Sequence, residues 1–180
     1  MIYATNNETL QPYLELPFTY SFLHGPHVVS SPEQALREGI SCVSLVHFAL
    51  RDLFGAELPP DLLFTEMYFD TQRFKPVQIN TMQAGDLFWV GKPNPLTPTA
   101  KFVPRYDTTG TELLNWNEMP VNHLGIYTGS NTRTGEPLIL HASETEGTTV
   151  LSTPRELAKH PRYAAHYGVS RLIEATQAAA

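Results

Sequence analysis

The sequence has little cysteine, little charge and no long hydrophobic run, and each shortage excludes a class of protein. One cysteine in 180 residues excludes an internal disulfide framework and any multi-cysteine zinc or iron–sulfur site. Twelve Lys and Arg against eighteen Asp and Glu give a net charge of −6 without a basic cluster. We therefore expect neither nucleic acid nor a membrane as a partner. The most apolar run, residues 42–50, is about half the ~20 residues of a membrane helix.

The composition indicates one globular domain. Hydrophobic residues make up 42%, aromatic residues 11% and charged residues 17%, which does not fit a disordered chain. We expect residues 1–180 to form a single domain, with an N-terminal arm over residues 1–30 and a long inserted loop over 91–120. The first residues show no secretory signal peptide. The chain is therefore expected to be cytoplasmic as synthesised, with export by a non-classical route as the alternative.

Helix signals come first along the chain and strand signals follow. Capping and glycine signals predict helices at 31–38, with Gly39 ending the first in a left-handed conformation, at 42–54, and after the prolines at 59–60. Short aromatic and β-branched runs predict strands at 86–90, 123–128, 137–142, 148–151 and 167–173, with a capping box at 153–156. This order predicts an α+β fold in which N-terminal helices pack on a central antiparallel β-sheet.

Cys42, the single thiol, is the first candidate for chemistry. A free cysteine is usually a buried and inert side chain. Cys42, however, lies in the predicted first turn of a helix, directly after Ser41. Unpaired N–H groups and the helix dipole at that end favour a thiolate, so we expect a pKa lowered towards neutrality. A cysteine nucleophile needs this property.

Two of the seven histidines lie on strands joined by a turn-rich segment. If these strands pair with His123 directly opposite His141, the two Cβ atoms lie ~5 Å apart on one face. Leu124, Ile126, Leu138 and Leu140 then point to the other face, towards a core. A slip of one residue would separate the two imidazoles. The other histidines have no evident geometric partner.

A thiol with two imidazoles in a row is typical of cysteine nucleophiles. One imidazole takes the thiol proton and later protonates the leaving amine, while the second holds the first in the right tautomer. A zinc site built from Cys42, His123 and His141 is the alternative, but it lacks ligand-like spacing and an evident fourth ligand. We expect no metal and no organic cofactor.

Three segments, in the same order, resemble the NlpC/P60 family of papain-like cysteine peptidases, which cleave peptides of the bacterial cell wall. Residues 41–46, Ser-Cys-Val-Ser-Leu-Val, are similar to the nucleophile motif, usually Asp-Cys-Ser-Gly-Leu-Val. Residues 82–88 resemble the Pro-Gly-Asp-Leu strand of the family. Residues 123–129 and 139–143 are similar to its His-Val-Gly-Ile-Tyr and Ile-His-Ala-Ser pair.

The resemblance implies a papain-like fold and a thiol-dependent hydrolase. It makes Cys42 the nucleophile, His123 the general base and His141 the third member of a catalytic triad. Tyr20 would correspond to the family's upstream site tyrosine, and Ser41 takes the place of the Asp before the nucleophile, so both are expected to bind substrate. The implied substrate is a peptidoglycan stem peptide, cut by an endopeptidase of the γ-D-glutamyl type.

The chain also departs from the family pattern, and these departures leave alternatives open. Ser41, the pair Val43-Ser44 and the insertion at 91–120 all replace family features around the nucleophile. The alternatives are an amidase or acyl transferase on another substrate, and a catalytically inactive peptide-binding domain. Because Cys42 precedes His123, the order of unpermuted peptidases is favoured over that of circularly permuted lipid acyltransferases.

Overall fold

The computed structural model describes residues 7–20, 29, 31–60, 62, 64–93 and 120–173. It shows helices packed on a six-stranded sheet of order β1-β6-β2-β3-β4-β5, in which every neighbouring pair is antiparallel. The elements are α1 (Asn7–Leu10), η1 (Gln11–Tyr13), α2 (Pro32–Glu38), α3 (Cys42–Phe54), α4 (Phe64–Phe69), β1 (Phe74–Val77), η2 (Ile79–Thr81), β2 (Leu87–Gly91), β3 (Val121–Ser130), β4 (Pro137–Ser143), β5 (Thr148–Ser152), α5 (Pro154–Leu157) and β6 (Ala165–Leu172). The predicted α+β organisation is confirmed, while its papain-like details stay a prediction.

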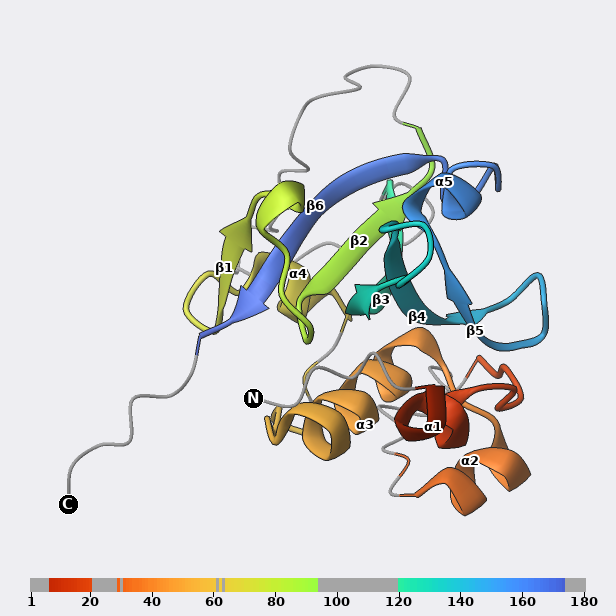
Figure 1. Cartoon of the computed structure of the whole chain (residues 1–180). Helices are drawn as coiled ribbons and strands as arrows, with labels where there is room; N and C mark the ends of the chain where they lie inside the picture. The colour runs from red at the N-terminus through yellow and green to blue at the C-terminus, as the bar shows by residue number, and fades with distance from the viewer. Residues whose placement is uncertain are drawn as a thin grey trace, which may run out of the picture.

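Helix α3 brings the candidate nucleophile to the sheet. Every residue from 42 to 50 is buried, as expected for a helix that is apolar on all sides, and the helix packs against β3 and β4. The Ser41 hydroxyl caps it by accepting the backbone N–H of Ser44 at 3.2 Å. Gly55, at φ 65° and ψ 24°, ends it in the left-handed conformation. In Figure 1 the N-terminal helices α1, α2 and α3 lie together on one side, below the sheet, and α5 lies apart from them.

The segment between α2 and α3 differs from the prediction in one dihedral angle. The Ser31 cap of α2 is confirmed, but Gly39 has φ 77° and ψ 173°, so its backbone is extended and not in the left-handed helical conformation. The chain leaves the helix here to enter a parallel bridge between Ile40 and Phe18. A Cβ at Gly39 would lie 2.8 Å from the Cβ of Thr19, and glycine alone fits this positive φ and close approach.

The N-terminal segment is bound to the edge of the sheet. Thr149 of β5 exchanges two backbone hydrogen bonds with this segment: its carbonyl accepts the Glu15 N–H at 2.9 Å, and its N–H donates to the Leu16 carbonyl at 2.9 Å. The Thr149 hydroxyl donates to the Tyr13 carbonyl at 2.6 Å and accepts the Leu16 N–H at 2.9 Å. The described part of the predicted arm therefore follows strand β5. It also contains two short helical turns, α1 and η1, that the sequence analysis missed.

Strand β1 was not predicted, because Phe74-Lys75-Pro76-Val77 has no regular alternation of apolar and polar residues. Only its first residue is buried. The strand exists because β6 supplies a partner along its whole length, from Phe74 opposite Leu172 to Val77 opposite Val169. This is a tertiary contact, and a local pattern does not reveal it.

A hydrophobic cluster lies on each face of the sheet. Successive residues of β2 alternate between them: Leu87 and Trp89 belong to the main cluster together with α3, and Phe88 and Val90 belong to a second cluster. The second cluster also includes Leu157 of α5 and Tyr163. Leu124, Ile126 and Leu140 belong to the main cluster, as predicted. The fourth residue of that prediction, Leu138, is only half-buried, near the start of β4.

The Asp of the second sequence motif has a structural role at the start of β2. Asp86 is 1% exposed and binds Arg171 of β6 through two hydrogen bonds, from Nε to Oδ1 at 2.7 Å and from a terminal nitrogen to Oδ2 at 2.8 Å. Its Oδ2 also accepts the backbone N–H of Gln83 at 2.7 Å. Such a paired carboxylate fixes β2 against β6.

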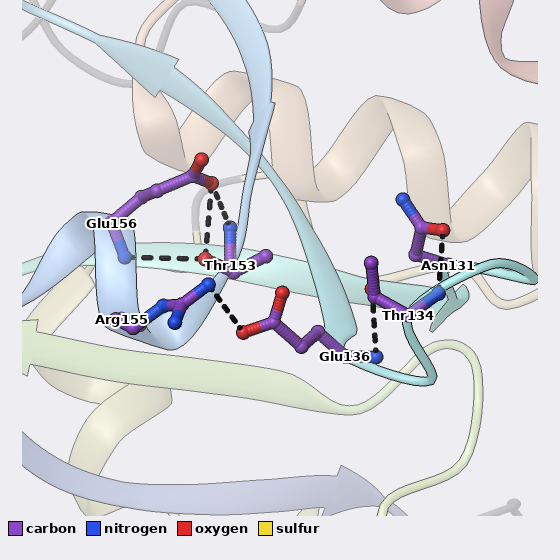
Figure 2. A network of polar contacts seen from close by, with 6 residues as sticks. All are labelled: Asn131, Thr134, Glu136, Thr153, Arg155 and Glu156. Atoms are coloured by element: carbon purple, nitrogen blue, oxygen red, sulfur yellow. Dashed lines mark hydrogen bonds and ion pairs between the residues drawn. The ribbon is translucent and has the colours of Figure 1, made fainter.

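Helix α5 follows β5 directly and is held by a capping box at its start and by an ion pair from its second residue, Arg155. The predicted capping box between Thr153 and Glu156 is confirmed. Figure 2 shows that the neighbouring Arg155 reaches Glu136 in the β3–β4 connection, with 3.0 Å between nitrogen and oxygen. In that connection Asn131 Oδ1 accepts the N–H of Thr134 at 3.2 Å. These contacts hold the end of β5 relative to the β3–β4 hairpin.

Most of the predicted insertion at 91–120 lies outside the described residues, which stop at 93 and resume at 120. Gly91 and Pro120 border it, and the Lys92 N–H donates to the Pro120 carbonyl at 2.9 Å. Within the described part of the chain, no helix has the length and apolar character needed to cross a membrane.

Candidate active site

The candidate site lies at the end of the ladder between strands β3 and β4. Their ladder runs from Ser130 opposite Pro137 to Ile126 opposite Leu140. Beyond that pair, β3 continues back to Val121 in contact with β2, and β4 continues to Ser143 in contact with β5. His123 and His141 therefore lie just beyond the last pair of the β3–β4 ladder.

The predicted register of the two histidines is wrong by two residues, yet their side chains meet. Direct opposition of His123 and His141 would place Ile126 opposite Leu138, whereas it lies opposite Leu140. One cause is the bulge at Thr128, between the pairs formed by Tyr127 and Gly129. Because an even shift keeps side chains on the same face, His123 Nε2 and His141 Nδ1 form a hydrogen bond of 3.0 Å.

A third residue extends this contact to strand β5. His141 Nε2 lies 3.0 Å from the hydroxyl oxygen of Ser152, and Ser152 stands opposite Ile139 in the β4–β5 ladder. The three side chains thus form a row across β3, β4 and β5 on one face of the sheet. The sequence analysis missed Ser152, because the diagonal contact becomes visible only when the register of β5 is known.

Cys42 enters the same region from the start of α3. Hydrogen bonds from the backbone N–H groups of Leu124, Val43 and Cys42 itself reach the sulfur. They lower the thiol pKa, but burial outweighs them and raises the pKa of Cys42 to about 11. The expected shift towards neutrality is therefore wrong for this structure, because the side chain is only 6% exposed and burial disfavours the thiolate.

Two observations place Cys42 near the histidine pair. Leu124, which donates its N–H to the sulfur, directly follows His123. The ring of Tyr163 stacks on His123 with 4.4 Å between centroids, and a negative charge on Cys42 contributes to raising the Tyr163 pKa to about 12, after burial. No hydrogen bond joins Cys42 to either histidine within the described segments.

Both imidazoles are neutral at pH 7. Burial lowers the pKa of His141 to about 4, and burial together with the nearby His141 and Arg162 lowers the pKa of His123 well below its usual value. Since Nε2 of His123 is engaged with His141, Nδ1 is the ring nitrogen left for a proton from a thiol. When this Nδ1 carries no proton, the neutral imidazole can accept one and act as a general base.

The two predicted substrate-binding residues lie in different surroundings. Tyr20 is 48% exposed and forms side-chain hydrogen bonds with Glu144 and Arg162, which are themselves joined as an ion pair. These three side chains are close enough to Tyr163 to affect its pKa, so Tyr20 lies on the side of the site that Tyr163 covers. Ser41 is 1% exposed and caps α3. Contact of either residue with a substrate stays a prediction.

Asn122 lies in a second bulge of β3, between the pairs that Val90 and Gly91 form with this strand. Bulges often occur next to active sites, where they redirect a side chain. The Oδ1 atom of Asn122 is buried and has no hydrogen-bond partner within the described residues. The bulge allows Val121 and Leu124 both to join the main cluster, with His123 between them.

A cavity of about 380 Å³ lies beside the row of polar side chains. His141, Ser152 and Tyr163 contribute to its wall. The remaining wall comes from β4, β5, α5 and their connections, through Ser143, Thr145, Glu146, Val150, Leu151, Glu156, Leu157 and His160. Within the described part of the chain, no group of three or more His, Cys, Asp and Glu side chains is arranged to hold a metal ion.

Gly125 is required where β3 approaches β4. A Cβ at this position would lie 2.6 Å from Ile139 Cγ2, 2.8 Å from the Leu140 carbonyl oxygen and 3.0 Å from the His141 Cβ. We expect Gly125→Ala to lower the free energy of unfolding by about 2–3 kcal/mol, because the strands must move apart. Urea denaturation measures this. The control Gly135→Ala, with φ 72° and nothing within 4 Å, should cost only about 1 kcal/mol; equal costs would contradict the close approach.

Comparison with known proteins adds little to this site. No protein-family model matches the chain, and no curated protein matches it. One solved structure to which this chain is similar is that of a Staphylococcus aureus subsp. aureus Mu50 protein described as similar to lipoprotein, NLP/P60 family. It is 19% identical, with a TM-score of 0.48, over 94% of this chain and 43% of that chain. This chain thus spans less than half of that protein, and the family resemblance depends on the sequence motifs.

Proposed function

We propose that this protein is a thiol-dependent amide hydrolase, a cysteine peptidase of the NlpC/P60 type. The observation that carries the proposal is the hydrogen bond of 3.0 Å between His123 and His141, next to Leu124, whose N–H donates to the sulfur of the chain's single cysteine. A histidine held by a second polar group next to a helix-borne cysteine is the arrangement that nucleophilic catalysis requires. Cys42 is the nucleophile, His123 the general base and His141 the orienting residue.

The reaction proceeds from a neutral thiol and a neutral imidazole. His123 Nδ1 accepts the thiol proton of Cys42 as the sulfur attacks the scissile carbonyl carbon. The N–H groups of Cys42 and Val43, which contact the sulfur before the reaction, turn to the oxyanion as the sulfur bonds to carbon, each donor contributing about 3 kcal/mol. His123 then returns the proton to the leaving amine, the C–N bond breaks, and a thioester remains on Cys42. A water molecule, deprotonated by His123, hydrolyses the thioester and restores the thiol.

The raised thiol pKa fits this order of events. With a pKa of about 11 for Cys42, little thiolate exists at pH 7, so proton transfer to His123 accompanies the attack and does not precede it. A substrate that enters the site also changes the surroundings of the sulfur.

Peptidoglycan stem peptides are the proposed substrate class, and the support comes from the three motif resemblances at 41–46, 82–88 and 123–143. We propose cleavage after a γ-linked D-glutamyl residue. An amidase or an acyl transferase uses the same thioester, and differs only in the bond cut or in the acceptor that takes the acyl group.

Product analysis tests the proposal. Purified protein is incubated at pH 7 with stem tripeptides and tetrapeptides that contain the γ-D-glutamyl linkage, and the products are identified by mass spectrometry. We expect hydrolysis at that linkage, absent with Cys42→Ala. The same reaction with an added amine distinguishes a transferase, which would form the new amide. No turnover of any peptide by the wild-type protein, together with an unreactive Cys42, would overturn the proposal in favour of a binding domain.

A further inference from the structure

The row of polar side chains does not end at His141. Its Nδ1 faces His123 Nε2 at 3.0 Å, and its Nε2 faces the Ser152 hydroxyl at 3.0 Å. A neutral imidazole has one N–H and one bare nitrogen. Only two arrangements are therefore consistent with both contacts, and they differ in where each proton lies.

The two arrangements have opposite consequences for His123. If Ser152 accepts the Nε2–H of His141, then His141 Nδ1 is bare, His123 carries its proton on Nε2, and His123 Nδ1 is free to accept a proton. If Ser152 donates to His141 instead, His123 carries its proton on Nδ1 and has no base nitrogen directed away from His141. The hydroxyl of one residue on β5 thus determines whether a histidine on β3 is a base.

We propose that Ser152 is a positioning residue, which accepts a hydrogen bond from His141 Nε2 and thereby keeps Nδ1 of His123 bare. The proposal rests on the proposed function and extends its catalytic group across a third strand. Ser152 touches neither the thiol nor His123, and it acts through His141. Second partners of this kind commonly set the tautomer of an active-site histidine.

One observation favours Ser152 as the acceptor, and a second shows that its position is fixed. The residue lines the cavity of about 380 Å³, so its own hydroxyl proton can be directed away from His141 towards that space. Its backbone is also well fixed, because Ser152 pairs with Ile139 and the next residue, Thr153, begins the capping box of α5. Figure 2 shows this cap together with the Arg155–Glu136 ion pair that connects α5 to the β3–β4 loop.

Two substitutions separate the effect of the hydroxyl from the effect of side-chain shape. Threonine and valine have almost the same volume, but Ser152→Thr keeps the hydroxyl and Ser152→Val removes it. The cavity gives the additional methyl groups room. On the peptide cleaved by the wild type, we expect Ser152→Val to lower kcat by about 10- to 100-fold with KM changed less than about threefold, because Ser152 does not contact the substrate. Ser152→Thr should stay within about threefold of the wild type.

The matched control is Ser143→Ala. Ser143 lies in the wall of the same cavity, and its hydroxyl accepts the Glu146 N–H, so it serves no histidine. We expect an unchanged kcat for this variant. Equal kcat values for the Thr and Val variants, or a change in KM alone, would overturn the proposal, since the hydroxyl would then have no effect on the chemical step.

Nitrogen NMR of the histidine rings gives a readout that does not depend on activity. Protonated and bare ring nitrogens have well-separated ¹⁵N resonances. At pH 7 we expect the wild type and Ser152→Thr to carry the protons of His123 and His141 on Nε2, and Ser152→Val to populate the Nδ1–H form of His141. A wild-type His141 protonated on Nδ1 would overturn the proposal. If no peptide is cleaved, the proposed function fails by itself, and the NMR result still decides the role of Ser152.

Discussion

Replacement of Cys42 by alanine is expected to lower the rate of peptide hydrolysis by a factor of at least about 10⁴, to the level of the uncatalysed background. The thiol is the only one in the chain, so no other side chain can form the thioester. His123→Ala should lose a similar factor, because the neutral thiol, with a pKa of about 11, needs a base to attack at pH 7. The measurement is kcat/KM on the same peptide with the same protein concentration.

The double variant provides the sharper test of this pair. If Cys42 and His123 act in one step, Cys42→Ala with His123→Ala should be no slower than either single variant. If the factors by which the two single substitutions lower kcat/KM multiply in the double variant, the two residues act independently, which would contradict the mechanism. His166→Ala serves as the control, because His166 lies on β6, is separated from His123 by strand β2 and stacks on Phe88.

Acid is expected to destabilise the protein well above the pH at which carboxylates titrate. The pKa of His141 is lowered to about 4 from 6.5, so between these values the unfolded chain binds more protons than the folded one. The contribution of His141 to the free energy of unfolding is therefore fully present above about pH 6.5 and is lost as the pH is lowered towards 4. From His141 alone we expect the free energy of unfolding to fall by about 2.5 kcal/mol between pH 7.5 and 4.5, and the lowered pKa of His123 acts in the same direction.

Urea denaturation at pH 7.5 and 4.5 measures this loss, and His141→Gln is the matched variant. Glutamine keeps hydrogen-bonding groups but has no charge to gain, so the variant should lose less stability between the two pH values. Burial also lowers the pKa values of His47 and His166. Because both residues are present in the wild type and in the variant, their contribution to the loss of stability cancels in the comparison. Identical losses in both proteins would contradict a buried neutral His141.

Local signals in the sequence were sufficient for the elements that carry the candidate site. The cap at Ser41 and the apolar run after it predicted the start and burial of α3, and the Thr153 capping box predicted α5. Alternation along β3 and β4 placed both histidines on one face. That prediction is correct although the register is wrong, because a shift of two residues leaves every side chain on the same face of the sheet.

Properties that depend on several elements at once were beyond the sequence. The bulge at Thr128 and the length of the β3–β4 connection together set the register, and neither has a distinctive residue pattern. The pKa of Cys42 depends on how completely β3 and α3 bury it, which outweighs the helix start that the sequence revealed. Ser152 resembles any strand-end serine until β4 and β5 are paired.

The two borders of the sheet have a consequence for how copies of this protein behave at high concentration. An open strand edge can pair with another chain and start a fibril or an extended aggregate. At one border, residues 16–18 occupy the free side of β5 through the Pro17–Thr148 bridge and the hydrogen bond from Thr149 to Leu16. At the other, β1 has only four residues and contains Lys75 and Pro76, which oppose the addition of a strand. Edge-to-edge growth of the sheet is therefore disfavoured on both sides.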